Sequence, residues 1–309
     1  MRTQQRLTSA FQKAKVEYFD ENSKFVIFSD CHRGIGGHQD EFTKNRNMYM
    51  YALDQYYKHG FTLIEAGDGD ELWEHPKFNV IKNAHVHVFE SMKRFYDDNR
   101  LVLIYGNHNN YLRDPKYFQE NFAEFYDDYT QKCSDFLKGL EPCEALVLKH
   151  KRNGQEILVV HGQQGDFAND QFWRFTMLSL KYFWRHLHAF GIKNPASPVK
   201  NAHKRHKIEK NFNKWIEKHE TMLICGHTHR FKYPREGDLP YFNTGCCIYP
   251  TSITGIEITG GVVQLVRWRT LYNEEGLLQI QKDVMRGPEP VGKFDIRSAH
   301  IDWLGSNEV

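Results

Sequence analysis

The sequence has few cysteines and no long apolar run. Only six of its 309 residues are cysteine, and none of them form a C-x-x-C pair, so we expect no disulfide framework. No stretch approaches the roughly 18 consecutive apolar residues that cross a bilayer. The first residues also lack the apolar segment that is typical of a signal peptide. These absences predict a cytoplasmic protein without a transmembrane segment.

An excess of one charge sign is missing too. The 41 Lys and Arg residues nearly balance the 39 Asp and Glu residues, so the formal charge is +2 and gives no global reason to expect nucleic acid. Hydrophobic residues make up 40% and charged residues 26%, which excludes a disordered, collagen-like or coiled-coil chain as an overall description. A chain of this length can bury a large core, and we predict one domain over residues 1–309.

Five short apolar segments have the character of buried strands. They cover residues 24–29, 61–66, 101–105, 157–160 and 221–225, and polar residues follow each of them directly. Continuous Val, Ile and Leu runs of this kind indicate strands that are buried on both faces. Helical patterns over 40–59 and 76–97 separate the first three segments. This alternation predicts an α/β sheet with helical cover.

The remaining chain is predicted to be rich in strands, apart from one insertion. Residues 144–160 have the pattern of a hairpin with Asn153-Gly154 at its turn. Further strands are expected at 241–243, 253–258 and 262–268, with Gly260-Gly261 as a tight turn. No element is predicted over residues 275–309.

The polar residues after the five strands form a set of metal-ligand types. Ligands gather beyond the carboxyl ends of strands in such sheets, so one shared site is expected. The set consists of Asp30, His32, Asp68, Asn107, His161, His227 and His229. Oxygen and imidazole donors without a thiolate suit Mn, Fe, Zn or Co better than a structural zinc. Seven ligands suit two ions that share a carboxylate, and such a pair attracts a phosphoryl group.

The motifs, taken in order, resemble a known family. The series D-x-H, G-D-x-x-E, G-N-H, H-G and G-H-x-H resembles the calcineurin-like metallophosphoesterases over about residues 24–260. The resemblance implies a β-sandwich flanked by helices. It also implies hydrolysis of a phosphomonoester or phosphodiester by a hydroxide held between two divalent metal ions, with manganese preferred and iron or zinc as alternatives.

Site residues follow from the same resemblance. It implies that seven residues bind metal: Asp30, His32 and His229 the first ion, Asn107, His161 and His227 the second, and Asp68 both. His108 would contact the substrate and protonate the leaving group as a general acid, and Glu71 would orient His108. Arg33 is a further candidate, for holding a phosphate oxygen.

The phosphorylated substrate stays open within this class. Residues Gly67–Trp73 resemble the G-D-x-x-E-x-W form of the UDP-diacylglucosamine pyrophosphohydrolases, but those enzymes usually have Arg where this chain has His108. A nucleotide-lipid pyrophosphohydrolase and a nuclease are therefore alternatives to a simple phosphatase or phosphodiesterase. A non-catalytic scaffold on the same fold is a further alternative, which is disfavoured because every ligand position and His108 are present. The sequence leaves the oligomeric state open.

The insertion between His161 and His227 is predicted to be a helical cap over about residues 164–220. It is rich in aromatic residues, and residues 174–218 contain eleven Lys and Arg residues against only Glu209 and Glu217. We favour a helical pair with a solvated basic face over a cap that binds an anionic, partly apolar substrate. A basic strip with aromatic residues also suits single-stranded nucleic acid, which we do not favour here.

Overall fold

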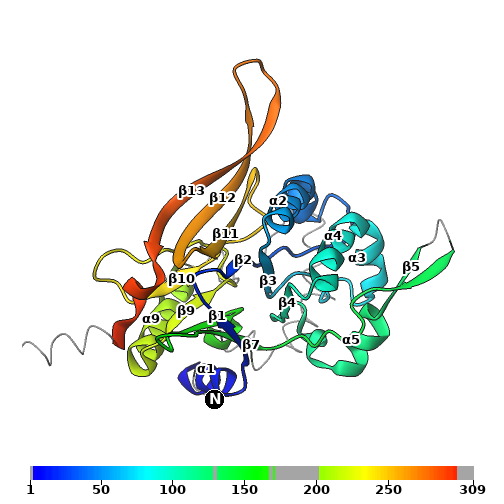
Figure 1. Ribbon diagram of the computed structural model, residues 1–309. Helices are drawn as coiled ribbons and strands as arrows, with labels where there is room; N and C mark the ends of the chain where they lie inside the picture. The colour runs from blue at the N-terminus through cyan, green and yellow to red at the C-terminus, as the bar shows by residue number, and fades with distance from the viewer. Residues whose placement is uncertain (1–2, 128–130, 167–169, 171–201, 298–309) are drawn as a thin grey trace, which may run out of the picture.

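Two β-sheets face each other in the computed structural model, which describes residues 3–127, 131–166, 170 and 202–297 (Figure 1). In spatial order the first sheet contains β1 (Lys15–Phe19), β7 (Ala145–His150), β8 (Glu156–Val160), β9 (Met222–Cys225) and β10 (Tyr241–Asn243). The second sheet contains β13 (Leu278–Pro290), β12 (Val262–Tyr272), β11 (Ser252–Thr259), β2 (Lys24–Phe28), β3 (Thr62–Ala66) and β4 (Leu101–Ile104). A separate hairpin is formed by β5 (Glu124–Asp127) and β6 (Lys132–Asp135).

The apolar strand runs explain why both faces of each sheet are covered. Successive side chains of a strand point to opposite faces. In β2, Phe25 and Ile27 join the core between the two sheets, and Val26 and Phe28 pack with the helices outside. In β8 the same alternation places some side chains in the core between the two sheets and the others in the core between the first sheet and its helices. A run with no polar position is thus buried on both sides.

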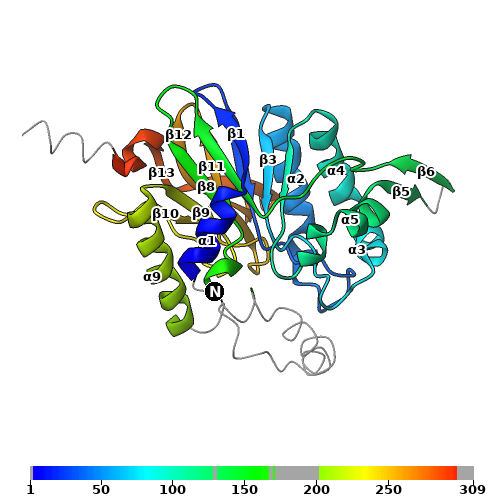
Figure 2. The ribbon, with the colours of Figure 1, turned by 90° about the horizontal axis from the view of Figure 1, so that it is seen from below.

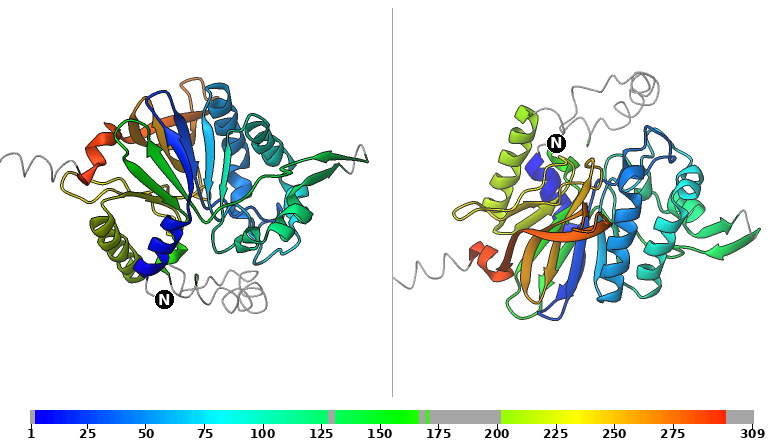
Figure 3. Two further views of the ribbon diagram at one scale, coloured as in Figure 1. Left: turned by 60° about the horizontal axis from the view of Figure 1, so that its bottom comes forward. Right: turned by 90° about the horizontal axis from the view of Figure 1, so that it is seen from above.

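Helices form the two outer layers, as Figures 2 and 3 show. The first sheet is covered by α1 (Thr3–Gln12) and α9 (Ala202–His219), which contribute Leu7, Phe212 and Trp215 to a shared core. The second sheet is covered by α2 (Arg46–Lys58), α3 (Phe78–Ala84) and α4 (Val86–Asp97). A further helix, α5 (Pro115–Phe122), and short 3₁₀ turns η1 (Glu41–Asn45), η2 (Asn110–Arg113), η3 (Gln163–Gly165) and η5 (Val291–Phe294) complete the described structure.

The predicted sandwich flanked by helices is confirmed, and all five predicted apolar strands are present. Strands β2, β3 and β4 are parallel neighbours, as are β8 and β9, whereas β7 and β8 form the predicted antiparallel hairpin. At the turn between β11 and β12, Gly260 and Gly261 have φ of +60° and +72°. Two successive positive φ values suit a tight hairpin turn.

The two predicted helices differ from expectation in their boundaries. Residues 40–59 begin with η1, and α2 starts only at Arg46. The segment 76–97 breaks at His85, which separates α3 from α4. At that break His85 Nε2 lies 2.7 Å from Asp40 Oδ2, and Asp40 also accepts backbone hydrogen bonds from Gly34 and Gly36. The break at His85 thus coincides with a buried contact to a segment distant in sequence, whereas at the start of the first segment Asp40 caps η1 through the Phe42 N–H.

Several elements have no counterpart in the sequence prediction. They are α1, α5, β1, the β5–β6 hairpin and β13, which pairs with β12 in a long hairpin that projects from the body of the molecule (Figure 1). Most of the predicted cap at 164–220 lies outside the described residues, and its last part is α9. Within the described ranges, none of the helices is both long and apolar enough to traverse a bilayer.

Candidate metal centre

The predicted ligands lie directly after five strands, at the same end of both sheets. Asp30 and His32 follow β2, Asp68 follows β3, Asn107 follows β4, His161 follows β8, and His227 and His229 follow β9. Strands β2 to β4 belong to the second sheet, and β8 and β9 belong to the first. The site therefore forms where the two sheets of the sandwich meet at their carboxyl ends.

The backbone is strained at most of these positions. Eight described residues other than glycine have a positive φ, and five of the eight are predicted ligands: Asp30, His32, Asp68, His227 and His229, with φ between 47° and 65°. The left-handed region is unfavourable for residues with a Cβ and costs roughly 1–3 kcal/mol for each such residue. Such strain collects where side chains must be aimed at a functional site.

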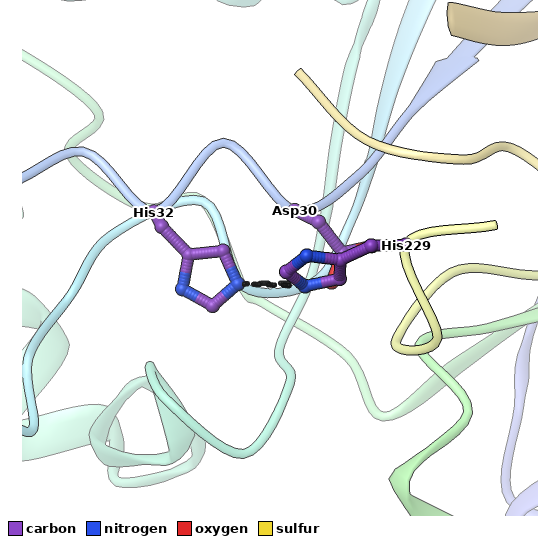
Figure 4. A group of neighbouring side chains, drawn as sticks. All are labelled: Asp30, His32 and His229. Carbon is purple, nitrogen blue, oxygen red and sulfur yellow. Dashed lines mark hydrogen bonds and ion pairs between the residues drawn. The ribbon is translucent and has the colours of Figure 1, made fainter. Parts of the chain in front are cut away.

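Asp30, His32 and His229 form one group of potential ligands (Figure 4). His229 Nε2 lies 3.0 Å from Asp30 Oδ1 and 3.2 Å from His32 Nε2. The Asp30 side chain is fully buried, and its Oδ1 has no hydrogen bond of normal geometry within the described structure. A buried carboxylate oxygen that faces two ring nitrogens without a hydrogen bond suits a bound cation.

A second group comprises Asp68, His161 and His227. His161 Nε2 lies 3.0 Å from Asp68 Oδ2 and 3.3 Å from His227 Nδ1. Asp68 is also within reach of the first group, because its Oδ2 is 3.9 Å from His32 Nε2. Its other oxygen accepts a hydrogen bond of 2.8 Å from the backbone N–H of His108. Asp68 is thus the carboxylate that lies between the two groups.

The ring nitrogens are arranged so that lone pairs face one another. His161 Nδ1 is 3.0 Å from the carbonyl oxygen of Ala66, and it donates a hydrogen bond there, so the lone pair of the neutral ring is on Nε2. In the same way His32 Nδ1 lies 3.0 Å from Glu71 Oε2, and its Nε2 faces the first group. Lone pairs that face each other and a carboxylate need a proton or a cation between them. The donor set therefore fits two metal ions.

Asn107 completes the oxygen donors. Its side chain is 2% exposed, and its Oδ1 has no hydrogen-bond partner in the part of the chain that the structure describes. The next residue, His108, contacts Asp68 through its backbone N–H, so Asn107 lies beside the second group. An unpaired buried amide oxygen is costly in an apolar surrounding, and it suits a hard or borderline cation.

The motif glycines allow this convergence. A Cβ on Gly106 would lie 2.2 Å from Asp68 Oδ1, and a Cβ on Gly226 would lie 2.4 Å from Asp30 Oδ2. Both distances are far below van der Waals contact, so any side chain at these positions would displace a carboxylate. The G-N-H and G-H-x-H motifs need glycine for this reason.

Glu71 contacts two imidazoles at the rim of the centre. Its carboxylate lies 2.7 Å from His108 Nδ1 and 3.0 Å from His32 Nδ1. The indole of Trp73 stacks on the His108 ring with a centroid distance of 4.2 Å. The His108 side chain is 21% exposed. Its ring is held on one side by a carboxylate and on one face by an indole, and it still reaches solvent.

The electrostatics of the centre are set by carboxylates and imidazoles at close range. Burial by itself raises the pKa of Glu71, but His108 and His32 outweigh it and lower the pKa to about 2. Burial likewise opposes ionisation of Asp30, yet His229 holds its pKa well below the usual range. For His32 burial opposes protonation, and Asp30 and Glu71 raise its pKa well above the usual value. The carboxylates are ionised and ready to bind cations.

Arg33 does not lie where a phosphate could reach it. Its guanidinium has no exposed surface and makes two hydrogen bonds to Glu65, of 2.7 and 2.8 Å, and one of 2.8 Å from Nε to Asp70. All of its directional donors are aimed into the protein interior. This geometry argues against the predicted contact with a phosphate oxygen and gives Arg33 a structural place between the loops after β2 and β3.

Sequence reasoning missed several residues that support the ligands. Asp166 lies with its Oδ2 3.7 Å from His227 Nε2, and no motif marks it. Asn109 Oδ1 accepts hydrogen bonds from the backbone N–H groups of Gly106 and Asp68, at 2.7 and 3.3 Å. Its position directly after the G-N-H motif was the available signal. The Asn109 amide holds the backbone of this loop. Because residue 109 is not Asp or Glu, it offers His108 no carboxylate.

Comparisons with known proteins give one family match. Residues 24–263 match the family model of the calcineurin-like phosphoesterase superfamily domain. None of the curated proteins matches the chain. Among solved structures the chain is similar to Vps29 of Chaetomium thermophilum, with a TM-score of 0.37 and 10% identity over 86% of this chain and 99% of that one. The family match contains all five motifs.

Proposed function

Because the chain belongs to the calcineurin-like phosphoesterase superfamily, we propose that it is a metal-dependent phosphoesterase that hydrolyses a phosphomonoester or a phosphodiester. The observation that carries the proposal is the pair of ligand groups with Asp68 between them. Asp30, His32 and His229 would hold one divalent ion, and Asn107, His161 and His227 the other. Manganese is the preferred ion, and iron or zinc suits the same donors.

Bound ions would supply a nucleophile from water and positive charge for the phosphoryl oxygens. The chain's own residues have two tasks at the ligand groups. Asp68 fixes the spacing of the two ligand groups, since one oxygen is held by the His108 N–H and the other faces the imidazoles. The buried hydrogen bond from His161 to the Ala66 carbonyl fixes the tautomer of that ligand.

His108 would transfer a proton to the leaving oxygen. Its Nδ1 faces Glu71 at 2.7 Å, so Nε2 is the atom left to deliver the proton. Glu71 and the stacked indole of Trp73 keep the ring in one orientation. A general acid in a fixed position contributes roughly 10²–10⁴-fold to the rate when the leaving group is poor.

The test is hydrolysis of a panel of phosphoesters by protein loaded with Mn²⁺, with metal content measured on the same samples. We expect turnover of a chromogenic monoester or diester, and we expect Asp68→Asn to lose bound metal and roughly 100-fold or more in turnover. The matched control is Asp20→Asn, because Asp20 precedes β2 and lies at the opposite end of the sandwich. Bound metal without hydrolysis of any ester would favour a scaffold, and full metal occupancy in Asp68→Asn would remove the bridging role.

A further inference from the structure

A pocket of about 410 Å³ adjoins the metal centre and takes no part in the roles described above. Asn107 belongs to both, because it is a predicted ligand and also lines the pocket. Charged and polar side chains make up most of the remaining wall, including Arg6, Lys13, Tyr105, Arg113 and Glu144. A group attached to a phosphoryl centre at the metal site can therefore extend into a polar chamber of ligand size.

One wall of the pocket comes from an element outside the family segment. Arg6 lies on α1 and Lys13 directly follows it, whereas the family match begins at residue 24. Leu7 and Ala10 anchor the helix to the first sheet, because both are buried in the core between that sheet and its helices. The N-terminal helix thus adds cationic side chains beside a site that the rest of the chain builds.

Ion pairs give this wall a fixed geometry. The Arg6 guanidinium donates to Glu144 at 2.7 Å and to Asp170 at 2.8 and 2.9 Å. Glu144 also accepts a hydrogen bond of 3.1 Å from the Gln164 side chain. These contacts join α1 to the segments before β7 and after η3, so ion pairs hold this wall of the pocket in place.

The charge of the pocket is positive once these pairs are counted. Its lining holds three cationic side chains and two carboxylates, Glu144 and Asp170. Arg6 satisfies both carboxylates, whereas Lys13 and Arg113 have no carboxylate within 4.0 Å among the described residues. Two cations that have no carboxylate partner among the described residues attract an anionic group.

We propose that this pocket binds a second phosphate group of the substrate, beyond the phosphorus that is hydrolysed. The inference rests on the proposed function and directs it to small substrates that carry two phosphates, such as a nucleoside diphosphate. Water would attack the terminal phosphorus, the phosphoanhydride bond to the bridging oxygen would break, and a nucleoside monophosphate and inorganic phosphate would leave. Lys13 and Arg113 are the specificity-determining residues, and Arg6 is a positioning residue that holds α1. An acyl chain does not suit this chamber, because its lining is polar.

The kinetic test compares ADP with p-nitrophenyl phosphate, which has a single phosphate. In the double variant Lys13→Ala/Arg113→Ala we expect KM for ADP to rise roughly five- to tenfold, because two exposed charge contacts are lost. The KM for p-nitrophenyl phosphate should stay within about twofold. The control variant is Arg152→Ala, whose side chain is 80% exposed on the β7–β8 turn at the other end of the sandwich. An unchanged KM for ADP, or an equal rise for both substrates, would overturn the assignment.

A binding test separates this inference from the proposed function. Metal-stripped full-length protein is titrated with ADP in a calorimeter at low and high salt. We expect binding that weakens with salt, weakens again in Lys13→Ala/Arg113→Ala, and tightens in Glu144→Gln because one negative charge is removed. If the protein hydrolyses no ester but binds ADP in this way, the pocket assignment holds and the phosphoesterase proposal fails. If ADP affinity is the same in all variants, the pocket assignment fails whatever the activity.

Discussion

His161 and His32 each direct one ring nitrogen toward the metal centre and use the other nitrogen for an oxygen atom beside it. His161 uses Nδ1 for the Ala66 carbonyl and His32 uses Nδ1 for Glu71, which leaves each Nε2 for the centre. The outer partner thus decides which nitrogen can bind metal. His108 also places its Nδ1 on Glu71, and its ring is partly exposed. It forms a third group of possible ligand atoms with His32 and Glu71, but it belongs neither to the group around Asp30 nor to the group around Asp68.

Replacing His108 tests this division. We expect His108→Ala to keep its metal content and to lose roughly 10²–10⁴-fold in turnover on an ester with a poor leaving group. An activated ester such as p-nitrophenyl phosphate needs less protonation and should lose much less. Metal analysis and steady-state kinetics on both esters measure the difference, and equal losses on the two esters would contradict the general-acid role.

Metal affinity should depend on pH through the same rings. Neutral imidazole binds metal, and the pKa of His32 in the metal-free protein lies well above its usual value because Asp30 and Glu71 stabilise the charged ring against burial. Protons therefore compete with the metal ion for the His32 ring at a higher pH than usual. The affinity for metal should fall as the pH is lowered through that raised pKa. The expected slope is about tenfold per pH unit for each displaced proton. Titrations with Mn²⁺ in a pH series measure it, and a flat profile between pH 8 and pH 5.5 would speak against His32 as a ligand.

At the scale of elements, the loops after β2 and β3 are joined along their length. His32 N–H donates to the Asp68 carbonyl and Arg33 N–H to the Gly69 carbonyl, both at 2.9 Å, and Glu71 N–H donates back to Arg33 at 3.0 Å. The buried Arg33 side chain adds ion pairs to Glu65 in β3 and to Asp70 in the following loop. Ligands from two strands are thus held in one unit.

Replacing the buried, positively charged side chain of Arg33 should destabilise the protein. In Arg33→Met, Glu65 and Asp70 would stay buried without a counter-charge, and we expect a loss of about 3–5 kcal/mol in the free energy of unfolding. Urea denaturation measures the loss, with the exposed Arg152→Met as the matched control. Adding Glu65→Gln and Asp70→Asn to the variant should recover part of the stability. An unchanged denaturation midpoint in Arg33→Met would show that the ion pairs are not needed.

At the scale of the whole molecule, the centre links the two sheets at one end of the sandwich. Ligands from β2 to β4 and from β8 and β9 approach each other there, and buried carboxylates lie close together among them. Ions that bind the folded chain and not the unfolded chain stabilise the fold by mass action. The stability of the sandwich is therefore coupled to metal.

Chelation should lower the melting temperature. At a free metal concentration 100 times Kd the stabilisation is about 2.7 kcal/mol, which corresponds to a shift of several degrees for a domain of this size. Calorimetry of the protein with Mn²⁺ and with EDTA measures the shift. Asp68→Asn should respond to Mn²⁺ less than the unaltered protein does, and an equal response of both proteins would contradict a shared site at Asp68.

Much of the architecture could be predicted because its signals are local. A strand buried on both faces appears as an unbroken apolar run. The candidate ligands are the polar residues directly after such runs, so short segments of sequence identify both the five strands and the ligand set. The long β13 could not be found in this way, because its side chains are mostly exposed and its pairing with β12 supplies the order.

By itself the sequence determined which side chains follow the strands and what chemistry they offer. Only the tertiary structure decided that Arg33 is enclosed by Glu65 and Asp70, that Asp40 contacts His85 where a predicted helix breaks, and that α1 lines a cationic pocket. Each of these depends on residues that are far apart along the chain. A periodic pattern records whether a position faces the core, but the partner that it meets there is fixed when the sheets and helices pack together.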